Sequence, residues 1–284
     1  MKSVVKGLGL SVVSFVIIGC GGGGSSSLPA NPSSSEMAKI TKDNSKKVSY
    51  SSLNNTINSN AINFIDNYSY ENSNYKNFRV ISNKIDKLNR STGDCVTGSS
   101  NVQGSEKNGK VQYNNCLLSS GAIVNGSASI VSNEAMKDVS FNNFKIEYEN
   151  SYIHIKSGHM ITIGGELPKT EHLYMDIKVD NKNLSYFNFN YNEQYNGEDN
   201  NLIINGYVKT PCTGGYVKIE TKPQISNYKY NPNGELDISS NGKTVKINFK
   251  GSEVNFTDID KNVTTYNLDD FKNIIENNCS ATLN

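Results

Sequence analysis

The sequence predicts a mainly β protein of the α+β class, in which helices cover an antiparallel sheet, flat or curved, that is built from hairpins. Three observations lead to this prediction. Apolar residues recur at helical spacing from Ile40 to Arg90, they alternate at a spacing of two after Cys95, and Asn-Gly pairs separate the alternating runs. With 284 residues, the chain is long enough for one large folded unit.

Residues 1–19 have the composition of a secretory signal peptide. Two lysines precede an apolar run from Leu8 to Ile18, which is too short for a comfortable membrane span. Removal of these residues would change the formal charge from +1 to −1 (26 − 27). A chain so close to neutral is not expected to bind nucleic acid, nor to bind a membrane through a basic surface.

The signal peptide ends in Ile17-Ile18-Gly19-Cys20, which resembles the lipobox of bacterial lipoproteins. The resemblance implies that Cys20 is acylated, becomes the first residue of the mature chain and makes the membrane a partner. The residue after it is Gly21, whereas an Asp there resembles the inner-membrane retention signal of enteric bacteria, so we expect the outer membrane. An ordinary cleaved signal peptide is the alternative.

Residues 20–39 are predicted to form a flexible tether, because they are rich in Gly and Ser and lack apolar periodicity. The folded unit is expected to span residues 40–284. Its first part, residues 40–92, is predicted to be helical and to pack on the sheet, with Asp43 or Asn44 as the first cap. Helical spacing relates Leu53, Ile57, Ala61, Phe64, Ile65, Tyr68, Phe78, Ile81, Ile85 and Leu88.

Residues 93–284 are predicted to form the antiparallel β region. The run LYMDIKVD places Leu173, Met175, Ile177 and Val179 on one face of a strand, and SYFNFNYN places Phe187, Phe189 and Tyr191 together. Hairpin turns are expected at Asn108-Gly109, Asn125-Gly126, Asn196-Gly197, Asn205-Gly206, Asn233-Gly234 and Asn241-Gly242. A short helix from Leu268 is expected near the end, with Asn267 or Asp269 as its cap.

Four cysteines follow Cys20, and an even number in an exported chain suggests two disulfides. A hairpin around Asn108-Gly109 would bring Cys95 close to Cys116, which leaves Cys212 to pair with Cys279. The alternatives are a Cys95–Cys212 pairing or thiols that stay reduced. No Cys-x-x-Cys pair supports a zinc site.

The sequence is also similar to a group of β-rich bacterial lipoproteins. The similarity lies in ITKDNSKKV (Ile40 to Val48), in DCVTG, GKVQYNNC and GAIVNGS around the first cysteine pair, and in CTGGYVKIET (Cys212 to Thr221). These motifs are turn and strand residues. The resemblance therefore implies the fold and no activity.

The search for chemical sites predicts no enzyme, no cofactor and no metal. His154 and His159 flank Ser157-Gly158, which could be a hairpin turn, and a metal site that adds His172 or Glu171 is the alternative to exposed strand histidines. No nucleophile elbow or His-Glu-x-x-His helix is present in the sequence. Asn255 and Asn262 lie in sequons that resemble bacterial N-glycosylation sites, although the abundance of Asn makes chance matches common.

The aromatic set Tyr186, Phe187, Phe189 and Tyr191 is expected to be core, with a ligand-binding surface as the alternative.

Taken together, these features predict a lipid-anchored, non-catalytic binding or structural protein on the periplasmic side of the outer membrane or on the cell surface. One alternative is a carrier that holds a hydrophobic ligand in a cavity between helices and sheet. Another is a surface adhesin that binds a protein partner.

Overall fold

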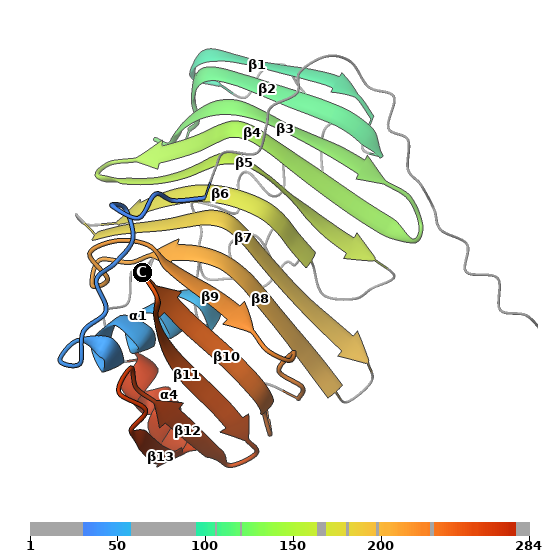
Figure 1. Ribbon diagram of the computed structural model, residues 1–284. Helices are drawn as coiled ribbons and strands as arrows, with labels where there is room; N and C mark the ends of the chain where they lie inside the picture. Colours follow the sequence, from blue (N-terminus) through green and yellow to red (C-terminus); the bar gives the residue numbers. More distant parts are fainter. Residues whose placement is uncertain are drawn as a thin grey trace, which may run out of the picture. The chain divides into compact units, whose positions relative to one another are not determined.

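A computed structural model shows one antiparallel sheet in which each strand pairs with its neighbours in the sequence. The structure describes residues 31–57, 95–105, 107–119, 121–163, 169–179, 182–196, 199–227 and 230–276. Its thirteen strands are β1 (Thr97–Gly104), β2 (Asn108–Leu117), β3 (Ile123–Ser132), β4 (Met136–Tyr148), β5 (Ser151–Ile163), β6 (Lys169–Val179), β7 (Lys182–Asn196), β8 (Asp199–Lys209), β9 (Val217–Thr221), β10 (Asn233–Ser240), β11 (Lys243–Lys250), β12 (Glu253–Thr257) and β13 (Val263–Asn267). Figure 1 shows this succession of strands from β1 to β13. The predicted mainly β, antiparallel architecture is therefore confirmed.

The two helices among the described residues are α1 (Ser45–Ile57) and α4 (Leu268–Glu276). They contact each other, and within the sheet α1 contacts β8 while α4 contacts β12 and β13. A helix of 13 residues is about 20 Å long, which is the width of about four strands. The expectation that helices cover the sheet is therefore too broad for the described residues, and residues 58–92 of the predicted helical segment lie outside them.

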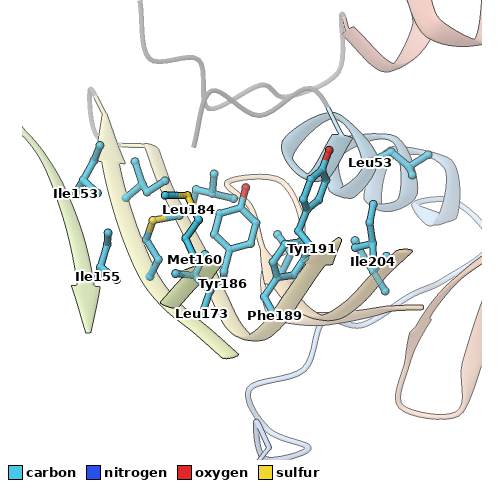
Figure 2. Close-up of a cluster of buried hydrophobic side chains, with 14 of the residues drawn as sticks. Leu53, Ile153, Ile155, Met160, Leu173, Leu184, Tyr186, Phe189, Tyr191 and Ile204 are labelled. Carbon is cyan, nitrogen blue, oxygen red and sulfur yellow. The ribbon is translucent and has the colours of Figure 1, made fainter. Parts of the chain in front are cut away.

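One face of the sheet, here called the inner face, carries the apolar core. In β6 the alternation predicted from the sequence is confirmed, because Leu173, Met175 and Ile177 are all buried. Figure 2 shows Leu53 of α1 in the same cluster as Leu173 and Phe189 of the sheet. The Tyr186 hydroxyl also donates a hydrogen bond to the Asn55 carbonyl, which joins the sheet to the end of α1.

The helix ends follow local hydrogen bonding. Asn267 caps α4, since its side chain accepts a hydrogen bond from the Asp269 N–H at 3.0 Å, as one of the two expected caps would. Asn44 precedes α1 and its carbonyl accepts the Val48 N–H, but its side-chain oxygen accepts from Thr41 N–H at 2.7 Å. No helix of the described residues has both the length and the apolar character needed to cross a membrane.

The segment before α1 is bonded to the sheet, although the sequence places it in the flexible tether. The Tyr216 N–H donates to the Glu36 carbonyl and the Ala38 N–H donates to the Tyr216 carbonyl, both at 2.8 Å. The side chain of Ala38 is buried, and the Ser240 hydroxyl donates to the Ala38 carbonyl. These contacts place residues 36–38 against the sheet.

Candidate functional site

A line of backbone irregularities crosses β1 to β8. Positive φ angles occur inside these strands at a glycine or at a polar residue, which alternate from β1 to β6: Gly98, Asn115, Gly126, Asn143, Gly158, His172, Asn188 and Gly206. Each glycine faces the backbone of the polar residue on the neighbouring strand; a Cβ at Gly126 would lie 1.9 Å from the Asn143 carbonyl oxygen. Bulges of this kind re-aim side chains and reverse the alternation beyond them.

The face opposite the core, here called the outer face, carries a row of side chains beside this line. The outer row is defined as Asn125, Asn143, Lys156, Tyr174, Phe187, Asn190 and Tyr207, which lie on the strands from β3 to β8, with Phe187 and Asn190 both on β7. The strand registers place these residues as neighbours: Asn125 lies beside the β4 bulge, Asn142 pairs with Ser157, Ser157 with Tyr174, and Phe187 with Tyr207. The row thus contains three amides, three aromatic rings and Lys156.

The amide groups are held by hydrogen bonds at their oxygen atoms. Asn125 Oδ1 accepts the Asn115 N–H at 2.8 Å, and Asn190 Oδ1, on the same face of β7, accepts the His172 N–H at 2.9 Å. Asn143 Oδ1 lies 2.7 Å from His154 Nε2. Partial burial lowers the pKa of His154, so the ring is neutral at pH 7 and can donate from Nε2.

The aromatic rings of the row form a cluster centred on Phe187. Its ring centroid lies 4.5 Å from that of Tyr174, 6.2 Å from that of Tyr207 and 6.0 Å from that of Tyr216. Tyr174 is 4% exposed and its hydroxyl has no hydrogen-bond partner in the described part of the chain. Burial raises the pKa of Tyr174 and of Tyr216, so both hydroxyls are protonated at neutral pH.

Two lysines in or beside the row form ion pairs. Lys156 Nζ lies 2.7 Å from Asp176 Oδ2, and Lys145 forms an ion pair with Glu147. Partial burial is the largest single effect and disfavours the charge of Lys156, but the hydrogen bond and the negative charge of Asp176, together with nearby tyrosines, outweigh it and raise the pKa of Lys156. The row therefore offers hydrogen-bond donors and ring surfaces with little net charge.

The predicted Cys95–Cys116 disulfide is present, with Cα atoms 5.1 Å apart. It links the residues just before β1 to β2, as the hairpin argument expects. Cys212 is disulfide-bonded as well. Its predicted partner Cys279 lies outside the described residues, as does Cys20.

The hairpin turn considered at Ser157-Gly158 is not formed, because residues 151–163 form the single strand β5 and Gly158 lies at a bulge. His154 and His159 therefore lie on one strand, His154 beside Asn143 and His159 3.7 Å from Asp138 Oδ1. His172 lies on β6, where Asn188 Oδ1 is 3.3 Å from its Nδ1. Across the described ranges, no group of three or more His, Cys, Asp or Glu is arranged to hold a metal ion.

The aromatic prediction for β7 is partly wrong. Tyr186, Phe189 and Tyr191 are buried in the core, but Phe187 lies on the outer face because the bulge at Asn188 shifts the alternation. The two predicted sequons differ in setting. Asn255 is in β12 with its Oδ1 accepting from the Thr265 hydroxyl at 2.8 Å, whereas Asn262 is exposed in a loop and donates to Asp258.

The sequence did not predict the outer row. Asn125-Gly126 and Asn205-Gly206 were interpreted as turns, but they lie inside β3 and β8. These dipeptides were the sequence feature that could have indicated bulges within strands. Fixed donors and rings are groups that can bind a ligand. Comparisons with protein-family models, with curated proteins and with solved structures find nothing that matches this chain.

Proposed function

We propose that this protein is an exported, lipid-anchored and non-catalytic binding protein of the outer membrane, attached through acylated Cys20. The attachment of residues 36–38 to the sheet supports a short tether between Cys20 and the folded part of the chain. From Cys20 to Glu36 the chain advances 16 residues (36 − 20), which reach at most about 56 Å. The sheet would then stay within about one domain diameter of the bilayer.

The observation that carries the binding function is the outer row. Its amide oxygens are bonded within the protein, while its NH₂ groups and the rings of Phe187 and Tyr207 face away from the core. Such side chains, held in place by the sheet, need little ordering when a ligand binds. Periplasmic or external ligands are both accessible to a protein held in this way.

The carrier alternative has less support. A carrier needs an apolar cavity, whereas the inner-face side chains of the described strands are buried and belong to one core cluster. Figure 2 shows these side chains, among them Met160, Leu184 and Tyr186, gathered in one cluster. The adhesin alternative uses an outward face and differs from the proposal only in the partner.

The anchor is tested by replacing Cys20 with Ala and fractionating cells. The variant should leave the membrane fraction, whereas a Ser25→Ala control should stay, and mass spectrometry of the wild-type protein should find acyl chains at Cys20. An unmodified N-terminus, or an unchanged membrane fraction for Cys20→Ala, would refute the anchor.

The binding face is tested by hydroxyl-radical labelling of tyrosines in purified protein and in intact envelopes. We expect Tyr207 to be labelled less in envelopes, because a bound ligand covers it. Tyr230, which is 76% exposed and lies outside the row, is the control and should be labelled equally. Equal labelling of Tyr207 in both samples would contradict a bound outer face.

A further inference from the structure

We propose that the ligand of the outer row is a neutral polysaccharide chain that lies across the strands. This inference rests on the proposed binding function and specifies the class of ligand. It is argued from the orientation of the amides, the position of the rings, the pairing of the charges and the length of the row.

The amide orientation follows from the identity of the bonded donors. Backbone N–H groups can only donate, so the atoms that face the Asn115 and His172 N–H groups must be the oxygens of Asn125 and Asn190. Their NH₂ groups therefore point the other way. In the described residues these NH₂ groups have no protein acceptor, so each can donate to a ligand oxygen.

The rings continue the row on β7 and β8. Phe187 and Tyr207 are half-buried, with their ring centroids 6.2 Å apart. Both rings lie beyond Asn125 and Asn143 in the direction across the strands, and Phe187 shares β7 with Asn190. Aromatic faces pack against the C–H faces of sugar rings, while amide donors bind hydroxyl and carbonyl oxygens. Adjacent donors and rings therefore match the two kinds of surface that a sugar chain presents.

The charges favour a neutral ligand. Lys156, the one cation of the row, is held by Asp176 at 2.7 Å, and Lys145 beside it is paired with Glu147. An acidic ligand would meet both carboxylates, and a basic one would meet both ammonium groups. A neutral chain needs no charge partner and avoids like-charge repulsion from the carboxylates and from the ammonium groups.

The length of the row favours a chain over a single sugar. From β3 to β8 the row crosses five strand spacings of about 4.8 Å, or about 24 Å. A single sugar ring would contact only one or two members. A polysaccharide can contact the amides and the rings together.

The test uses the full chain in detergent, run in native gels that contain dextran, mannan or hydroxyethylcellulose as neutral polysaccharides, or heparin as an acidic one. At least one neutral polysaccharide should retard the wild-type protein. Asn125→Asp and Asn190→Asp keep the shape and the acceptor oxygen but remove the NH₂ donor, so each should weaken retardation about tenfold. Tyr207→Ala should weaken it by a similar factor.

Matched controls carry the same changes outside the row. Asn183→Asp, near the start of β7, and Tyr230→Ala should bind like the wild type, and circular dichroism should show every variant folded. Absence of retardation in all three neutral gels, retardation by heparin alone, or equal retardation of row variants and wild type would overturn the proposal. If Tyr207 is nevertheless protected in envelopes, the binding face stands and only the ligand class is wrong.

Discussion

Asn-Gly pairs give this chain left-handed backbone conformations, and they serve two purposes. Asn241 and Gly242, with φ of 47° and 75°, close the two-residue turn between β10 and β11. Gly126, with φ of 90°, instead lies inside β3, where the register shifts between Asn125 and Ser127. The dipeptide is the same, but its position relative to the strand pairing differs.

Gly126→Ala is expected to destabilise the protein by about 3 kcal/mol or more, because the new Cβ adds a backbone clash to the strain of a positive φ. Gly242→Ala is the matched control. Its φ is also positive, but nothing lies within 4 Å of the added Cβ, so it should cost about 1 kcal/mol. Urea denaturation measures both, and equal losses would show that the close approach at Gly126 is unimportant.

Ionised Glu235 is expected to stabilise the folded protein, so the free energy of unfolding should fall at acidic pH. In the folded protein, the hydrogen bond from Lys246 lowers the pKa of Glu235 below its ordinary value of 4.5. A carboxyl with a lowered folded pKa contributes stability above pH 4.5, and this contribution is lost as the pH falls through the folded value.

Replacing Glu235 with Gln should therefore lower the free energy of unfolding at pH 7 by about 0.5 kcal/mol, a small value because Lys246 is 42% exposed. The difference from the wild type should disappear near pH 3. Urea denaturation at pH 7 and pH 3 measures it, and a difference that persists at pH 3 would point to packing rather than to charge.

At the scale of elements, long strands and short connections build the sheet. β7 has 15 residues and β1 has eight, and neighbouring strands pair in antiparallel register. β1 has a strand on one side only and is largely exposed. The Cys95–Cys116 disulfide holds the residue before β1 to β2, so it stabilises the least buried end of the sheet.

The double variant Cys95→Ala/Cys116→Ala should lower the free energy of unfolding by about 3 kcal/mol, the loop-closure value for a sequence separation of 21. Both cysteines are replaced so that no free thiol remains from the pair. Urea denaturation without reductant provides the measurement. An unchanged transition would mean that the disulfide does not restrict the unfolded chain.

At the scale of the whole molecule, the strand order makes the sheet almost one-dimensional. Each strand contacts its neighbours in the sequence, so stability should depend on position along the array, as in repeat proteins. The C-terminal strands have additional support, because Phe271 of α4 packs against Tyr50 of α1 and Phe249 of β11. The sheet should therefore open from β1.

Hydrogen exchange tests this gradient. In the double cysteine variant, amide exchange should accelerate in β1 and β2 and stay unchanged in β10 and β11, which lie far along the array. The unmodified protein is the reference. Uniform acceleration over all strands would show that the sheet unfolds as a single cooperative unit.

The sequence by itself determined what depends on neighbouring residues. Leu173, Met175 and Ile177 share the buried face because they are spaced by two along β6, and the extra residue of the bulge opposite Leu173 and Met175 lies on β7. Asn267 caps α4 through a bond two residues away, and Cys95 pairs with Cys116 across one hairpin. Each of these outcomes is fixed by side-chain spacing or a short loop. Local physical chemistry is therefore sufficient to predict them.

Only the tertiary structure decided where the chain turns and which outward side chains meet. A glycine with positive φ fits a turn or a bulge equally well, and for Gly158 and Gly206 the partner strand makes the choice. The bulge at Asn188 then moved Phe187 to the face opposite Phe189. The outer row depends on the register of six strands, because each pairing shifts the next by whole residues and no single segment contains that information.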